Sequence, residues 1–130
     1  MRAIINFIQD LRKMSWIVQA WLMILGISNM MLPIVLFKHM EAKIMLLATI
    51  TGFMIGVLLH KRKGMTRILG FMHAPWLFAI FFLIKGIITS GAFDLYNLWM
   101  AIALVLTFLS LILDIRDVAK YYSGHKELII

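Results

Sequence analysis

The sequence predicts an all-α integral membrane protein, a four-transmembrane-helix bundle with an N-terminal interfacial helix and a short cytoplasmic C-terminal helix. Its 130 residues are 63% hydrophobic and 15% charged, with a mean hydropathy of +0.96. Soluble domains are roughly half apolar and a quarter charged. Four apolar segments also approach the length of about 20 residues that a helix needs to cross a bilayer. These segments occupy most of the chain, so we treat residues 1–130 as a single membrane domain.

The distribution of Lys and Arg predicts the orientation of the bundle. Most of these residues flank one side of the four apolar segments, in the two tails and the middle connection, and only three fall on the other side: Lys38, Lys43 and Lys85. Because basic residues concentrate on the cytoplasmic side of a membrane, we expect both termini to be cytoplasmic. The composition is typical of small bacterial inner-membrane proteins. The formal charge of +7 does not indicate nucleic-acid binding, since the cations lie at the ends of apolar segments.

The N-terminal part of the chain contains two expected elements. In residues 3–15, Ile4, Phe7 and Leu11 recur at helical spacing, which predicts an amphipathic helix at the membrane interface. The first span covers 16–37 and is too long for the apolar region of a signal peptide. Within it, Pro33 cannot donate a hydrogen bond to the carbonyl of Asn29, so we expect a kink.

The second and third spans are expected at 44–60 and 68–90, joined by a cytoplasmic turn. The second span is short and is preceded by an outer turn at residues 38–43. The third span admits two registers. If the membrane begins near Ile68, His73 lies inside the bilayer; if Pro75 opens the helix, with Trp76 as interfacial anchor, His73 lies at headgroup level. We favour the second register, which ends the helix near Ser90 with Gly91 as its C-terminal cap.

The fourth span is expected at 95–115, with Tyr96 and Trp99 as outer aromatic anchors. Residues 116–130 form the cytoplasmic tail, whose first part continues as a helix. The expected topology therefore has four spans and both tails in the cytoplasm.

Small residues recur every four positions along the second span, at Ala48, Gly52 and Gly56. This pattern lets two helices approach closely in lipid, where van der Waals contact replaces the hydrophobic driving force. The ladder predicts helix packing, either within one bundle or between subunits.

Four polar residues form the candidate site, and they fall near the inner ends of the third and fourth spans. His73 and Asp114 lie on neighbouring spans, where an imidazole and a carboxylate could relay protons or bind a headgroup. Asp117 follows one helical turn after Asp114, and Arg67 could supply a cation between the two carboxylates. Alternatively, these residues form a structural cap that joins the two spans, or they simply face headgroups and water.

The sequence predicts no cofactor and no metal site. It contains no cysteine, which excludes thiolate metal sites within the chain. His60 and His73 leave open a b-type haem between neighbouring spans. No catalytic motif is present, and no Asp or Glu is expected deep in a span, which argues against a conventional proton-coupled exporter.

The leading hypothesis is therefore a non-enzymatic protein that acts by helix association, as an accessory subunit of a larger membrane complex or as a homo-oligomer. Its partners would be the lipid bilayer and other membrane helices. The alternative is an oligomeric small transporter, channel or lipid-headgroup-binding protein that uses the cytoplasmic-side site at His73 and Asp114.

Overall fold

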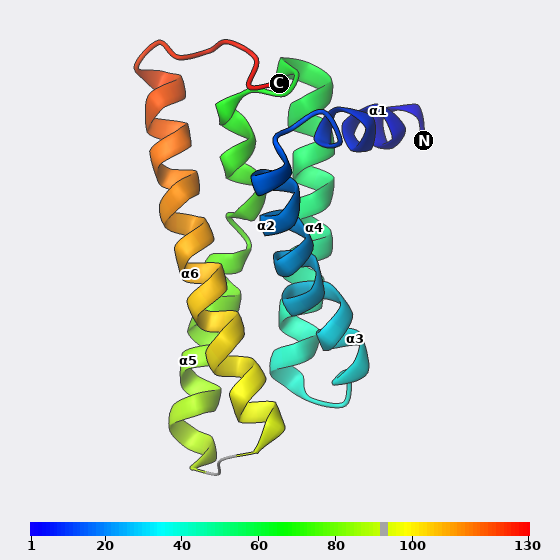
Figure 1. Cartoon of the computed structure of the whole chain (residues 1–130). Coiled ribbons are helices and arrows are strands. Elements are labelled where there is room, and N and C mark those ends of the chain that lie inside the picture. The colour runs from blue at the N-terminus through cyan, green and yellow to red at the C-terminus, as the bar shows by residue number, and fades with distance from the viewer. Residues whose placement is uncertain (92–93) are drawn as a thin grey trace.

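The computed structural model describes residues 1–91 and 94–130, and all regular structure in these residues is helical (Figure 1). Most of the chain runs along one bundle axis, and α1 crosses its end (Figure 1). The elements in chain order are α1 (Arg2–Leu11), α2 (Trp16–Gly26), the π-helical turn η1 (Ile27–Met31), α3 (Leu32–Val35), α4 (Met40–Lys63), the 3₁₀ helix η2 (Arg67–His73), α5 (Trp76–Ser90) and α6 (Leu95–Tyr122).

The described residues contain three helices long and apolar enough to cross a membrane: Trp16–Val35, Met40–Lys63 and Leu95–Tyr122. A fourth span results if η2 and α5, which are bent by 41° relative to each other, count as one crossing. The predicted all-helical membrane class is confirmed at this level.

The first span contains a π-helical turn where the sequence predicts a simple kink, and its helix ends at Val35. Pro33 has no N–H to give to the carbonyl of Asn29. The hydroxyl of Thr49 donates to that carbonyl instead, at 2.9 Å, and so connects the first span to α4. The irregular turn also places Ser28 and Asn29 in the interior of the bundle.

The second span is longer than predicted, because both of its expected flanking turns are helical. α4 begins at Met40, within the expected outer turn, and ends at Lys63, beyond the expected limit of 60. Its length is about 36 Å at 1.5 Å per residue. Four basic or imidazole side chains fill its last turn, where cations are favoured by the helix dipole. Gly64, with φ of 71°, ends the helix.

The third span is not one continuous helix over 68–90. Residues Arg67–His73 form the tighter η2, and α5 begins at Trp76, immediately after Pro75. Proline removes a backbone donor and clashes with the preceding turn, which explains the break. α5 ends at Ser90, and Gly91 adopts the left-handed conformation with φ of 62°.

The fourth span and the expected C-terminal helix form one continuous helix, α6. Asp94 caps it by accepting a hydrogen bond from the Asn97 amide at 2.8 Å. The chain after Tyr122 is not helical and returns across the end of the bundle (Figure 1), where the Ile129 amide donates to the carbonyl of Met65 at 2.9 Å.

The apolar face of α1 packs against the chain itself. Phe7 is fully buried, and its ring lies 5.5 Å from that of Phe53 on α4. Ile4 and Leu11 pack against the same cluster, which includes Val57. Part of the apolar stripe that the sequence assigns to the membrane interface is therefore covered by α4.

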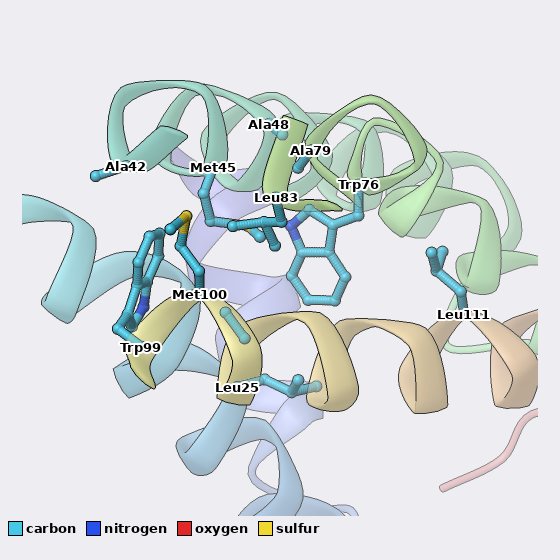
Figure 2. Close-up of a cluster of buried hydrophobic side chains, with 11 residues drawn as sticks. Leu25, Ala42, Met45, Ala48, Trp76, Ala79, Leu83, Trp99, Met100 and Leu111 are labelled. Carbon is cyan, nitrogen blue, oxygen red and sulfur yellow. The ribbon is translucent and has the colours of Figure 1, made fainter. Parts of the chain in front are cut away.

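The main core lies between α4, α5 and α6, with Leu25 contributed by α2 (Figure 2). The indoles of Trp76 and Trp99 project into it (Figure 2). Each indole N–H is satisfied: Trp76 donates to the Thr49 hydroxyl at 3.0 Å, and Trp99 donates to the Ser28 carbonyl at 2.8 Å. The core is thus apolar in bulk but joined by buried hydrogen bonds.

The small-residue ladder of α4 packs within the chain. Ala48, Gly52 and Gly56 are all buried. A Cβ at Gly52 would collide with the backbone carbonyl of Met72, and one at Gly56 would lie 3.0 to 3.3 Å from the Met72 side chain. Gly52 and Gly56 of the ladder therefore receive η2.

Substitutions at three glycines should differ in effect according to what a new methyl group meets. We expect Gly52→Ala to lower the free energy of unfolding by about 1–3 kcal/mol, because backbone must move. Gly56→Ala should cost less, since the flexible Met72 side chain can shift. Gly26→Ala is the control: its Cβ meets nothing within 4 Å, so it should be neutral or stabilise by up to about 1 kcal/mol.

Unfolding in mixed micelles with increasing SDS, followed by circular dichroism, measures these differences. If Gly52→Ala proved as stable as Gly26→Ala, close packing of η2 against α4 would be wrong.

Candidate functional site

His73 and Asp114 form a hydrogen-bonded pair between η2 and α6. The imidazole Nδ1 and the carboxylate Oδ2 are 2.6 Å apart, and the two side chains are only 14% and 16% exposed. His73 ends η2, and Trp76 begins α5 just beyond the Pro75 break. This geometry stacks their rings, with centroids 4.2 Å apart and planes within 8°. The imidazole is therefore held by a carboxylate at its edge and an indole at its face.

A second pair lies one helical turn along α6. The guanidinium of Arg67 donates to Asp117 at 3.1 Å, and both side chains are partly exposed. Arg67 and His73 stand at opposite ends of η2, so each of the two carboxylates on α6 has its own partner. The four candidate residues thus meet in two pairs that join η2 to α6.

Gly70 lets η2 approach α6 closely between these pairs. A Cβ there would lie 2.9 Å from the carbonyl oxygen of Asp114. The close approach brings the imidazole within hydrogen-bonding reach of the carboxylate. Gly70 is therefore a positioning residue for the site, one that sequence reasoning did not single out.

The two residues of the His73–Asp114 pair line different cavities. Asp114 lines an apolar groove of about 370 Å³ between η2, α5 and α6, which also includes Phe71 and Leu111. His73 lines a smaller cavity of about 150 Å³ that reaches Thr49 and Trp76.

The structure does not favour the haem hypothesis. His60 bonds through Nε2 to Asp10 at 2.7 Å, and its ring packs on Phe7, while His73 bonds to a different carboxylate. Haem ligation through Nε2 of His60 would require this nitrogen to leave Asp10. Among residues 1–91 and 94–130, no three His, Asp or Glu side chains converge as a metal site would require.

Sequence reasoning missed a polar cluster at the opposite end of the bundle. Tyr96 donates a short hydrogen bond to Glu41, and the ring of His39 stacks on Tyr96 with centroids 3.7 Å apart. Glu41 also lies close to Gly86 of α5. The sequence places Glu41 in the expected outer turn, and only its helical conformation turns it towards α5 and α6.

The pairing of Asp10 with His60 was also missed, because 50 residues separate them in sequence. Asp10 accepts from Lys13 at 2.8 Å through its other oxygen. These hydrogen bonds, that of Lys13 first and that of His60 second, hold the pKa of Asp10 below its usual value of 3.8. The ionised carboxylate therefore fastens α1 to the end of α4.

The fold and this site define an all-helical protein with several helices apolar enough to be embedded in a membrane. Comparison with protein-family models, curated proteins and solved structures finds no significant match to this chain.

The lowered pKa of Asp10 predicts acid release of α1. Lys13 lies three residues from Asp10, so only the hydrogen bond to His60 links the lowered pKa to docking of α1 on α4. The stabilisation from that bond is fully present above pH 3.8 and is lost as pH falls through the lowered pKa. We expect α1 to separate from α4 in that range. The sequence contains no cysteine, so spin labels can be attached selectively at Ile8→Cys and Leu58→Cys, which are both exposed. Electron–electron double resonance then measures the distance between the two labels.

Asp10→Asn is the matched control, since it cannot titrate at this position. In this variant the distance between the two spin labels should not change over the pH range in which Asp10 of the parent is protonated. If the parent and Asp10→Asn showed the same acid transition, that transition would have to arise from other carboxyl groups.

Proposed function

We propose that this chain is a non-enzymatic multi-pass protein of the bacterial inner membrane that acts by helix association, as an accessory subunit of a larger complex or as a homo-oligomer. The two termini and the connection between α4 and η2 lie at the same end of the bundle (Figure 1). These segments carry most of the Lys and Arg. Their shared position supports a cytoplasmic location for both termini.

The observation that carries this proposal is the incomplete packing of α2. In α2, all of which the structure describes, Leu25 is the one buried residue. An apolar groove of about 590 Å³ separates this helix from Leu113 on α6, and its other lining residues include Trp16, Trp21 and Ile24. Since the small-residue ladder is occupied by η2, this groove is the surface at which we place a partner helix.

Filling the groove should disrupt association. Ala20 lines it, so Ala20→Trp should release the partner or dissociate the oligomer. Ile88→Trp, at a residue 75% exposed on α5, adds an indole elsewhere and should have no effect. Native mass spectrometry after mild extraction from membranes reads the mass of the assembly. The same assembly in both variants would exclude the α2 groove, and a lone monomer in the parent would exclude association.

A second candidate function is an oligomeric small transporter or channel, or a lipid-headgroup-binding protein, that uses the site at His73 and Asp114. Polar groups occur at three levels on the inner face of α6: Tyr96 with Glu41, Thr107 with Asn29, and Asp114 with His73. The intervals along α6 are about 16 Å and about 10 Å. Together they approach the hydrocarbon thickness of about 30 Å. This series, with a titratable pair at each end and a neutral polar pair between them, is the observation that favours the second candidate.

Proton flux into proteoliposomes, measured with an enclosed pH-sensitive dye, tests this second function. We expect His73→Ala and Glu41→Gln each to lower the flux by at least about tenfold, because each removes a titratable group from the series. Asp94→Asn should retain full flux, since asparagine preserves the cap of α6. Unchanged flux in His73→Ala, with only reduced stability, would make the pair structural.

A further inference from the structure

The beginning of α1 and the last turn of α4 enclose a pocket of about 450 Å³ at the end of the bundle where both termini lie. It belongs neither to the His73–Asp114 site nor to the groove of α2. Its walls come from six residues: Met1, Arg2, Ala3, Asn6, His60 and Lys61. Two cationic side chains and an amide therefore face one space from two different helices.

The cations in this pocket are available to a ligand. Arg2, Asn6 and Lys61 are all exposed. In the described part of the chain, neither Arg2 nor Lys61 forms an ion pair with a carboxylate. A guanidinium, an ammonium and an amide N–H₂ together make a donor set for phosphate oxygens.

The helix that carries Arg2 and Asn6 is held in place. Phe7 is fully buried against α4, and the hydrogen bond from His60 to Asp10 fastens the other end of α1. Asp10 does not line the pocket, and both of its oxygens already accept hydrogen bonds from His60 and Lys13. The helix that bears Arg2 and Asn6 is thus docked before a ligand arrives, and the carboxylate of Asp10 is already bonded to its own partners.

An exposed apolar stripe leads from this pocket along α4. It consists of Leu47, Ile50, Met54 and Leu58, which are 46 to 67% exposed and recur at helical spacing on the face that ends at Lys61. The distance from Leu47 to Lys61 is about 21 Å along the helix. That length exceeds the half-thickness of the hydrocarbon region, so the stripe can accompany an acyl chain through one leaflet.

We propose that this pocket binds one anionic phospholipid. Arg2, Asn6 and Lys61 contact its phosphate, and one acyl chain lies along the α4 stripe. Free phosphate would bind to the same donors but would make no contact with the adjoining apolar surface. The site depends on membrane embedding and is independent of helix association and of proton movement.

The proposal is tested by lipid retention in native mass spectrometry of the full chain in neutral detergent. Phosphatidylglycerol and phosphatidylcholine with the same acyl chains serve as probes. We expect preferential retention of phosphatidylglycerol, and a 10- to 30-fold loss, roughly, in Arg2→Ala/Lys61→Ala, because each basic group near an anionic surface contributes to binding. Arg12→Ala/Arg116→Ala removes the same charge at exposed sites outside the pocket and should retain the lipid.

A second comparison separates a lipid from free phosphate. Leu58→Asn should weaken phosphatidylglycerol retention without affecting binding of inorganic phosphate, and Ile88→Asn on α5 is its control. If excess inorganic phosphate displaced the lipid fully and Leu58→Asn had no effect, the pocket would be a phosphate site and the lipid proposal would be wrong. Equal retention of the two lipids, or equal loss in the two double-alanine variants, would also overturn it.

Circular dichroism of each variant distinguishes loss of the site from loss of the fold. Should Arg2→Ala/Lys61→Ala not fold, the single variant Lys61→Gln keeps the length of the side chain while removing its charge. Lys61→Gln that folds and retains phosphatidylglycerol at the parent level would equally overturn the proposal.

Discussion

A buried hydrogen-bond network centred on Asn29 connects the first span with α4, α5 and α6. Its side-chain amide donates to Thr107 on α6 at 2.9 Å, and its carbonyl accepts from Thr49 on α4. Thr49 in turn accepts from the indole of Trp76 on α5. Lipid offers no hydrogen bonds to polar groups, so the side-chain N–H₂ and the backbone carbonyl of Asn29 find their partners within the protein. The need to satisfy them specifies which helices meet and at what depth.

Two prolines create the irregular segments that this arrangement requires. Pro33 removes the donor that would normally bond to the carbonyl of Asn29 four residues back, and Thr49 on α4 donates to that carbonyl. Pro75 separates η2 from α5, and the narrow 3₁₀ segment then fits between Gly52 on α4 and the backbone of Asp114 on α6. Glycine is needed where η2 meets each neighbour, because a side chain there would separate the helices.

The end of the bundle that carries both termini is closed by hydrogen-bonded pairs of ionisable side chains. η2 supplies Arg67 and His73 to the carboxylates of α6, and α1 supplies Asp10 to His60 on α4. Partly buried ionisable groups are costly unless paired, so these contacts restrict how the surface elements can dock. Arg2 and Lys61 have no carboxylate partner among the described residues and line one pocket together, so they form a surface suited to an anionic ligand.

The sequence by itself determined the helical membrane class and much of the element order, because a bilayer imposes length and polarity on every spanning segment. It also located the break at Pro75 and the cap at Gly91, which depend on local backbone chemistry. Only the tertiary structure decided that η2 occupies the small-residue ladder, that Glu41 turns inward to Tyr96, and that Asp10 holds His60. Apolar periodicity identifies the face of a helix that is buried, but the partner of that face depends on three-dimensional packing between residues distant in sequence.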